Sequence, residues 1–139
     1  MNPNEMANLH SMSGLLTRPW SSNEYRNLLK NKATRFYYVE NGFLVAQILG
    51  EEAEILNVVV HPDFRRQGKA KLLICKFEKA ARDEGSVKCF LEVAESNNSA
   101  HELYLHLGYK LAGRRKNYYD LQDGSKVNAV ILSKNFKLS

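Results

Sequence analysis

The 139-residue sequence predicts an α/β fold in which helices flank one central, twisted, mixed β-sheet. Short apolar stretches alternate along the chain with amphipathic helical patterns, which is typical of this fold class. Residues 54–60 are almost continuously apolar, as in a strand that is covered on both faces. A chain of this length forms one domain, which we take to span residues 1–139.

The expected elements follow from hydrophobic periodicity and from the residues that typically begin or end helices and strands. In chain order they are helix 6–16, helix 22–30, strand 35–39, strand 43–49, strand 54–60, helix 68–83, strand 87–93, a helix to residue 107 after a cap at Ser99, strand 109–118 and strand 126–132. Ser21 or Ser22 is expected to cap the second helix, with Glu24 near its positive end. Ser99 and Glu102 have the spacing of a capping box.

Composition narrows the class of protein. Charged residues make up 25% of the chain and hydrophobic residues 44%, and no apolar run is long enough to span a membrane. No secretory signal is evident, so we expect a cytoplasmic protein without a membrane partner. Cys75 and Cys89 are too few for a disulfide framework and are expected to be reduced thiols at or near the core. The net charge of +5 suits a phosphate-bearing partner, but the basic residues are scattered and do not require nucleic acid.

The junction between strand 54–60 and the following helix is the most informative segment. Gly68 opens the helix, and free backbone N–H groups at a helix start, together with its dipole, attract anions. Arg65, Arg66 and Lys69 add positive charge. Neither a dinucleotide-binding motif nor a P-loop is present. The residues alone leave open a pyrophosphate site or an ordinary basic helix start.

A family resemblance extends this interpretation. The spacing of Val60, Pro62, Arg65, Gly68 and Ala70 resembles the coenzyme A pyrophosphate loop of the GNAT superfamily of N-acetyltransferases, which reads Q/R-x-x-G-x-G/A. The likeness continues through segments 19–21, 91–93, 96–97, 100–104, 107–109, 114–119 and 123–124. This combination is similar to the RimI type, the ribosomal-protein-alanine N-acetyltransferases. The resemblance implies the GNAT fold and acetyl-coenzyme A as cosubstrate.

The resemblance also implies where the coenzyme binds. In this family the strand before the loop diverges from its parallel neighbour, and pantetheine pairs with its exposed backbone. The loop and the helix start would hold the pyrophosphate, and Asn97 would hydrogen-bond near the pantetheine arm. The residues expected to hold the coenzyme are Val58, Val59, Val60, Arg65, Arg66, Gln67, Gly68, Lys69, Ala70, Lys71 and Asn97.

Glu92 and Tyr104 are the candidate catalytic residues. Glu92 interrupts an apolar strand on the face opposite Leu91 and Val93, and a buried carboxylate is a stronger base near neutral pH. It would take the proton of an attacking amine, directly or through water. By the resemblance, Tyr104 would lie beside the thioester sulfur and protonate the departing thiolate. The structural alternatives are an ion pair for Glu92 and core packing for Tyr104.

Some features depart from the family pattern or point elsewhere. The family begins with a strand before its first helix, but residues 1–4 leave almost no room for one here. We therefore expect this first strand to be missing or vestigial. Trp20 and Tyr118 are expected to contact the acceptor. His101 and His106 are one residue too far apart for the H-E-x-x-H zinc motif, so we expect no metal site.

These inferences predict an N-terminal protein acetyltransferase that works by direct attack without a covalent acyl-enzyme. By the resemblance, its partner is the N-terminus of a ribosomal protein, and the acceptor is the N-terminal alanine of the eighteenth small-subunit ribosomal protein. Two alternatives stay open. One is an acetyltransferase for a lysine side chain or a small amine, and the other is a coenzyme-binding or ribosome-associated module without turnover.

Overall fold

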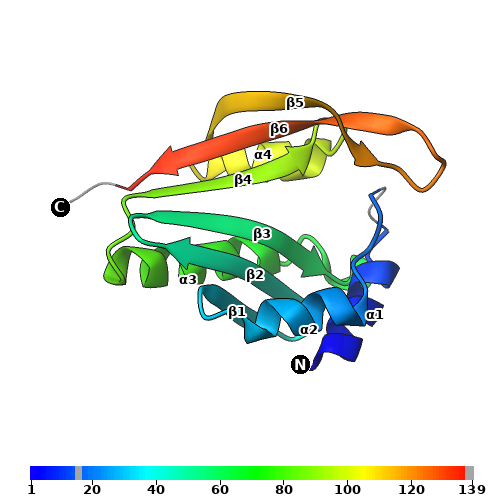
Figure 1. Ribbon diagram of the computed structural model, residues 1–139, viewed down its shortest axis with the longest axis horizontal. Helices are drawn as coiled ribbons and strands as arrows, with labels where there is room; N and C mark the ends of the chain where they lie inside the picture. The colour runs from blue at the N-terminus through cyan, green and yellow to red at the C-terminus, as the bar shows by residue number, and fades with distance from the viewer. Residues whose placement is uncertain (15–16, 137–139) are drawn as a thin grey trace.

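The computed structural model describes residues 1–14 and 17–136, and within them six strands form one sheet in the order β1-β2-β3-β4-β6-β5. The elements are α1 (Pro3–Met12), α2 (Ser22–Lys30), β1 (Thr34–Val39), β2 (Gly42–Leu49), β3 (Glu52–Val60), the 3-10 turn η1 (Pro62–Phe64), α3 (Lys69–Asp83), β4 (Lys88–Ala94), α4 (Asn98–His106), β5 (Lys110–Asp120) and β6 (Lys126–Asn135). Helices α1 and α2 lie on one face of the sheet, and α3 and α4 lie on the other (Figure 1). The α/β class and the flanking helices are confirmed.

The sheet is mixed, as the resemblance implied. Only β3 and β4 pair in parallel, and the other neighbours pair antiparallel. The parallel connection runs through α3, which crosses the sheet face as a βαβ unit requires. This unit places the start of α3 beside the carboxyl ends of β3 and β4, where sites gather in parallel sheets.

The larger core lies between the sheet and the helices α3 and α4. Its members include Leu73, Phe77 and Leu91, which are almost completely buried. Glu78 is buried beside this core and keeps two partners. Its carboxylate accepts hydrogen bonds of 2.8 Å from the Tyr109 hydroxyl and from the Lys134 ammonium. A buried charge needs such partners, and here they tie α3 to β6.

The predicted caps differ in their outcome. Ser21 caps α2 as expected, and Glu24 completes the capping box. The capping box expected at Ser99 is wrong, because α4 begins at Asn98. Its N-cap is Asn97, whose side chain accepts a hydrogen bond of 3.3 Å from the Ala100 amide. The chain enters the helix two residues earlier than the Ser99 spacing indicated.

Two further expectations concern the chain start and the cysteines. Helix α1 begins at Pro3, and residues 1–2 before it are not in a strand. The end of the expected helix 6–16 lies partly at residues 15–16, outside the described residues. Cys89 is buried, but Cys75 is exposed on α3, so the expectation that both lie at or near the core is wrong for Cys75.

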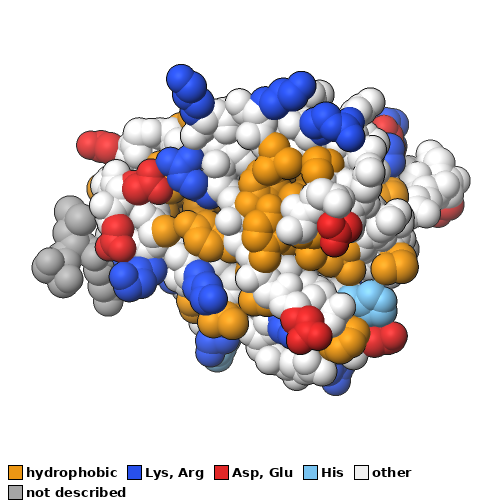
Figure 2. Space-filling model, turned by 90° about the horizontal axis from the view of Figure 1, so that it is seen from below, with side chains coloured by type: hydrophobic (Ala, Val, Ile, Leu, Met, Phe, Trp, Pro, Cys, Tyr) orange, Lys and Arg blue, Asp and Glu red, His pale blue; other side chains and the backbone are white. Residues whose placement is uncertain are grey.

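Surface charge is mixed on the face shown in Figure 2. Lysine and arginine side chains are spread around the edge of this face, acidic side chains lie between them, and hydrophobic side chains occupy its middle. This face therefore carries no continuous basic stripe of the kind that nucleic-acid-binding surfaces present.

The smaller core joins α1 and α2 to β3, and His10 is its polar centre. The His10 Nδ1 atom accepts hydrogen bonds from the Trp20 backbone N–H, at 3.0 Å, and from the Tyr25 hydroxyl, at 2.8 Å. Because Nδ1 accepts, the ring hydrogen sits on Nε2 and the imidazole is neutral. The Asn57 amide on β3 lies 3.5 Å from the same Nδ1 atom. His10 thus fixes α1, Trp20 and α2 relative to β3.

This geometry gives a pH dependence of stability. Burial, with a smaller contribution from the charge of Arg18, lowers the pKa of His10 from 6.5 to about 4. Between these two pH values the unfolded chain binds a proton that the folded protein excludes. This contribution is therefore complete above pH 6.5 and is lost as pH falls toward 4.

In a His10→Asn variant, the side-chain oxygen can replace Nδ1 as acceptor but cannot take up a proton. We therefore expect its melting temperature to fall less steeply with decreasing pH than that of the unmodified protein. Thermal melts across this pH range measure the difference. Parallel curves for the two proteins would contradict the assignment.

Candidate active site

The site forms where β3 and β4 separate. Their parallel ladder pairs residues 52–55 with residues 88–91 and stops at Ile55 and Leu91, although β3 continues to Val60. A bulge accounts for the change of direction. Ala46 pairs with Ile55 and Val45 with Asn57, so Leu56 has no opposite residue in β2. The two strands diverge beyond this point (Figure 1), and the β4-facing backbone edge of β3 is left outside the ladder.

A cleft of about 760 Å³ occupies this divergence. It is lined by every residue predicted to hold the coenzyme except Gln67, and it also contains both candidate catalytic residues, Glu92 and Tyr104. The residues come from β3, the loop 61–68, the start of α3, the end of β4 and α4. The structure therefore brings together segments that are distant in the sequence.

The loop before α3 has the backbone of an anion site. Arg66 has φ of 62° and Gly68 has φ of 76°, and such left-handed residues turn successive N–H groups toward one side. No side chain caps the N-terminus of α3, whereas Asn2, Ser21 and Asn97 cap the other three helices of the described chain. The first N–H groups of α3 thus remain available to a ligand.

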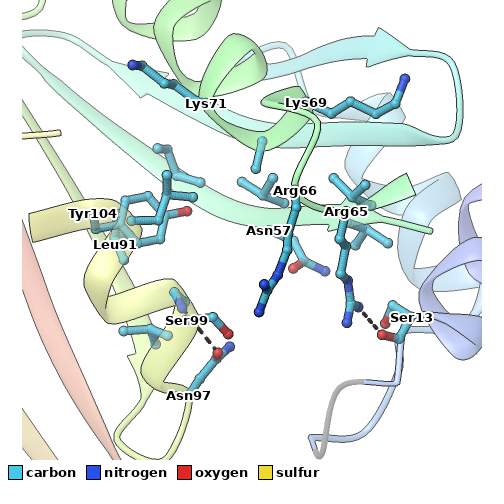
Figure 3. Close-up of a pocket in the computed structure, with 18 of the residues that line it drawn as sticks. Ser13, Asn57, Arg65, Arg66, Lys69, Lys71, Leu91, Asn97, Ser99 and Tyr104 are labelled. Carbon is cyan, nitrogen blue, oxygen red and sulfur yellow. Dashed lines mark hydrogen bonds between the residues drawn. The ribbon is translucent and has the colours of Figure 1, made fainter. Parts of the chain in front are cut away.

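The basic side chains of this region are directed differently (Figure 3). Arg66 extends from the loop into the cleft, and Lys69 and Lys71 run away from it. The Lys69 ammonium lies 6.0 Å from the centroid of the Phe64 ring. The Arg65 guanidinium instead donates a hydrogen bond to the carbonyl of Ser13, at the end of α1. Arg65 therefore bridges the loop and α1.

Asn97 reaches the same cleft from α4. The side-chain oxygen of Asn97 accepts a hydrogen bond from the backbone amide of Ala100 (Figure 3), and this bond occupies the acceptor end of the side-chain amide. Its amide nitrogen is the end left to donate to a ligand. The capping bond holds the Asn97 side chain in place, so this donor is oriented in advance.

A second cleft, of about 770 Å³, meets the first. The two share residues at the strand divergence, among them Asn57, Glu92 and Asn97. Trp20 and Tyr118, the predicted acceptor-contacting residues, both line the second cleft. One open space thus leads from the loop 61–68, past Glu92, to the aromatic side chains.

An irregularity in β5 sets the position of two of these aromatics. Between Arg115 and Tyr119 the pairing with β6 shifts, and Asn117 has φ of 50°. The Asn117 amide donates a hydrogen bond of 2.9 Å to the side chain of Asn128 on β6. This bulge brings Tyr118 and Tyr119 to the second cleft, with their ring centroids 5.1 Å apart.

Glu92 lies at the junction and lines both clefts. Its side chain is 18% exposed, so the expectation of a buried carboxylate is wrong. Its Oε1 atom lies 2.9 Å from the Nε atom of Arg115, with which it forms an ion pair. The ion pair considered as an alternative for Glu92 is therefore present, and the carboxylate still borders the open space.

Tyr104 combines packing with access to the cleft. It is 6% exposed, belongs to the larger core and contacts Tyr109 edge to face at 5.3 Å. Its side chain also points from α4 into the cleft, toward Leu91 (Figure 3). Burial raises the pKa of Tyr104, so the phenol is protonated at neutral pH. This is the form that a proton donor requires.

The strand junction is electrostatically negative. Burial raises the pKa of Glu54 on β3, and the charge of Glu92 raises it further. The pKa of Tyr119 rises to about 12, first through burial and then through Glu92. The positive charge of Arg115 lowers the pKa of both Glu54 and Tyr119, so Arg115 partly offsets the negative charge of the two glutamates.

Sequence reasoning missed four residues of the site. His10 and Asn57 line the second cleft, and Glu54 and Arg115 surround Glu92. The apolar run 55–60 could have singled out Asn57, because Asn57 is the polar residue that interrupts it. The other three depend on contacts between distant segments, for which no local signal exists.

Two searches of the described residues concern other kinds of site. Residues 1–14 and 17–136 contain no group of three or more His, Cys, Asp or Glu side chains placed to hold a metal ion. Within the same residues, each helix is too short or too polar to cross a membrane.

Comparison with known proteins agrees with this geometry. The acetyltransferase (GNAT) family model matches residues 6–109. The ribosomal protein bS18-alanine N-acetyltransferase of Haemophilus ducreyi is 36% identical over 119 residues, which cover 83% of this chain and 82% of that protein. The corresponding Escherichia coli K12 enzyme is 32% identical over 83% of this chain and 80% of its own.

Solved structures show the same fold. The ribosomal-protein-S18-alanine N-acetyltransferase of Escherichia coli superposes with a TM-score of 0.84 at 25% identity, covering 96% of this chain and 86% of that one. Arabidopsis thaliana NAA60 in complex with acetyl-CoA shares the fold at 18% identity, with a TM-score of 0.80 over 98% and 96% of the two chains. The chain therefore belongs to the GNAT family of acetyltransferases, in its ribosomal-protein-alanine (RimI) branch, and is an acetyl-coenzyme A-dependent N-acetyltransferase.

Proposed function

We propose that this enzyme transfers the acetyl group of acetyl-coenzyme A to the α-amine of the N-terminal alanine of ribosomal protein bS18. The observation that carries the proposal is the meeting of two clefts at Glu92. One cleft ends in an uncapped helix start suited to a pyrophosphate, and the other is lined by aromatic and polar side chains suited to a peptide. The names of the bacterial relatives supply the identity of the acceptor.

The coenzyme would lie in the first cleft. The N–H groups at the start of α3 and the side chain of Arg66 would hold the pyrophosphate. The backbone edge of Val58 to Val60 would pair with the pantetheine arm, because this edge is outside the ladder with β4. Such pairing would direct the thioester toward the junction, where Glu92 and Tyr104 meet the same space.

Starting from the α-ammonium, the nitrogen must lose two protons in all, and the sulfur must gain one. Glu92 would take a proton from the α-ammonium, directly or through water, and the freed amine nitrogen would attack the thioester carbonyl carbon. The new C–N bond forms as the C–S bond breaks, and Tyr104 would donate a proton to the departing sulfur. The nitrogen would lose its second proton as the amide forms, and a proton from solvent would restore Tyr104. The products are the N-acetylated protein, free coenzyme A and one released proton. An α-amine has a pKa near 8, so a modest base suffices.

A ribosomal acceptor also indicates where the reaction takes place. Ribosomal proteins are synthesised and assembled in the cytoplasm, and we propose that compartment for this enzyme. The partner is then a protein N-terminus, and no direct contact with nucleic acid is required.

The Glu92→Gln variant tests the proposed base. General-base catalysis contributes about 100-fold or more, so we expect kcat to fall by at least that factor on a bS18 N-terminal peptide. Thiol release measured with a disulfide reagent reports the rate. Glu102→Gln, a change on the exposed surface of α4, is the matched control and should retain turnover. Full activity of Glu92→Gln across pH would refute this role.

A pair of tyrosine variants separates catalysis from folding. Tyr104→Phe keeps the packed ring but removes the hydroxyl, so kcat should fall by about tenfold or more with little change in melting temperature. Tyr109→Phe removes a buried hydrogen bond to Glu78, so it should lower the free energy of unfolding by about 1.5 to 3 kcal/mol. The Tyr109→Phe enzyme should retain kcat at a temperature where it is folded. The opposite pattern would assign Tyr104 to packing alone.

The acceptor itself is tested by comparing kcat/KM on three amines. An alanine-led bS18 peptide should exceed a peptide whose only free amine is a lysine side chain, and also a polyamine, by about 100-fold. The lysine ammonium has a pKa near 10.4, so it holds its proton more firmly than an α-amine. A preference for lysine or polyamine would redirect the proposal, and coenzyme binding without turnover on any amine would favour a binding module.

A further inference from the structure

Arg115 contacts the proposed base but stands outside the reaction space. Its Nε atom lies 2.9 Å from the Oε1 atom of Glu92, and its guanidinium lies 5.2 Å from the ring centroid of Tyr118. Glu92 lines both clefts, whereas Arg115 is not among the described residues that line either of them. Arg115 therefore approaches the carboxylate from outside the clefts.

The ion pair is too exposed to be explained by stability. The Arg115 side chain is 53% exposed and that of Glu92 is 18% exposed. Pairs exposed to this degree contribute about 0 to 1 kcal/mol to folding. A close ion pair of this kind nevertheless restrains the direction of the Glu92 carboxylate, because the terminal torsion of a glutamate is otherwise broad.

The other groups around Glu92 make this restraint necessary. Glu54 faces it from β3, and Tyr118 and Tyr119 lie near it on β5. Glu54 and Glu92 repel each other, and Arg115 is the cation that offsets the repulsion. Without Arg115, we expect the Glu92 side chain to turn away from Glu54 and lose its defined direction.

We propose that Arg115 is a positioning residue for Glu92. Its ion pair with Oε1 restrains a carboxylate that borders both clefts, where the acceptor amine must release its proton. Its contact with Tyr118 links this orientation to the wall of the second cleft. The proposal rests on the proposed function, in particular on Glu92 as the base.

The test compares Arg115→Gln and Arg115→Lys with Arg114→Gln. Arg114 is the adjacent residue, is similarly exposed at 58% and has its own carboxylate partner, Glu95, at 3.7 Å. For Arg115→Gln we expect kcat on the bS18 peptide to fall by about ten- to 100-fold, because small misplacements of a catalytic group have effects of this size. The KM values for peptide and acetyl-coenzyme A should stay within about twofold. Arg115→Lys should recover part of kcat, and Arg114→Gln should retain it.

A double-mutant cycle with Glu92→Gln separates positioning from a general effect on folding. If Arg115 acts through Glu92, Arg115→Gln should have little further effect on the residual turnover of Glu92→Gln. An equal fold-loss in both backgrounds would overturn the proposal, even where Arg115→Gln also lowers the melting temperature. Unchanged kcat in Arg115→Gln, or a raised peptide KM at unchanged kcat, would overturn it as well.

The same cycle distinguishes failure of this inference from failure of the proposed function. A Glu92→Gln variant with full turnover refutes the base itself. An inactive Glu92→Gln variant beside a fully active Arg115→Gln variant leaves the base in place and refutes only the role of Arg115.

Discussion

The parallel ladder between β3 and β4 stops at Ile55 and Leu91, and the whole candidate site depends on this early separation. The bulge at Leu56 bends β3 while its pairing with β2 continues on the other side. A sheet without the bulge would extend the ladder and close the space between the strands. The separation opens the clefts, exposes a backbone edge and leaves Glu92 at their junction.

The remaining elements supply the site with different kinds of restraint. The α3 junction offers backbone N–H groups, α4 brings Tyr104 and Asn97, and the irregular part of β5 brings Tyr118. On the opposite face of the sheet, His10 holds Trp20 against the wall of the second cleft. The coenzyme side is thus built largely from backbone, whereas the acceptor side is built from side chains. Side chains vary more freely in evolution than backbone geometry, which suits a family with one coenzyme and many acceptors.

Local patterns in the sequence predicted most of the fold. The apolar stripe of residues 68–83 has the period of a helix, and the apolar run 54–60 is typical of a buried strand. The spacing from Arg65 to Ala70 marks the loop between them. The error at Ser99 has a local cause. Asn97 also precedes the helix at a capping distance, and the backbone at Asn97, with φ of −85° and ψ of 79°, starts the helical turn there. Sequence spacing alone does not choose between two such caps.

The error at Glu92 has a different origin. Its exposure and its partner Arg115 depend on the register of β5, which contains a three-residue irregularity opposite Asn128. Register in such a strand is decided by contacts with β6 and not by its own alternation. His10 was missed for a similar reason, because its partners lie in α2, the Trp20 segment and β3. Residues defined by long-range contacts leave little trace in a single sequence.

The uncapped start of α3 connects coenzyme supply to the persistence of the folded enzyme. With no side chain to satisfy its first N–H groups, this helix end depends on water or a bound anion for its hydrogen bonds. A ligand that binds the folded state alone stabilises it in proportion to the logarithm of ligand concentration. A higher concentration of coenzyme A would therefore raise the free energy of unfolding of this enzyme.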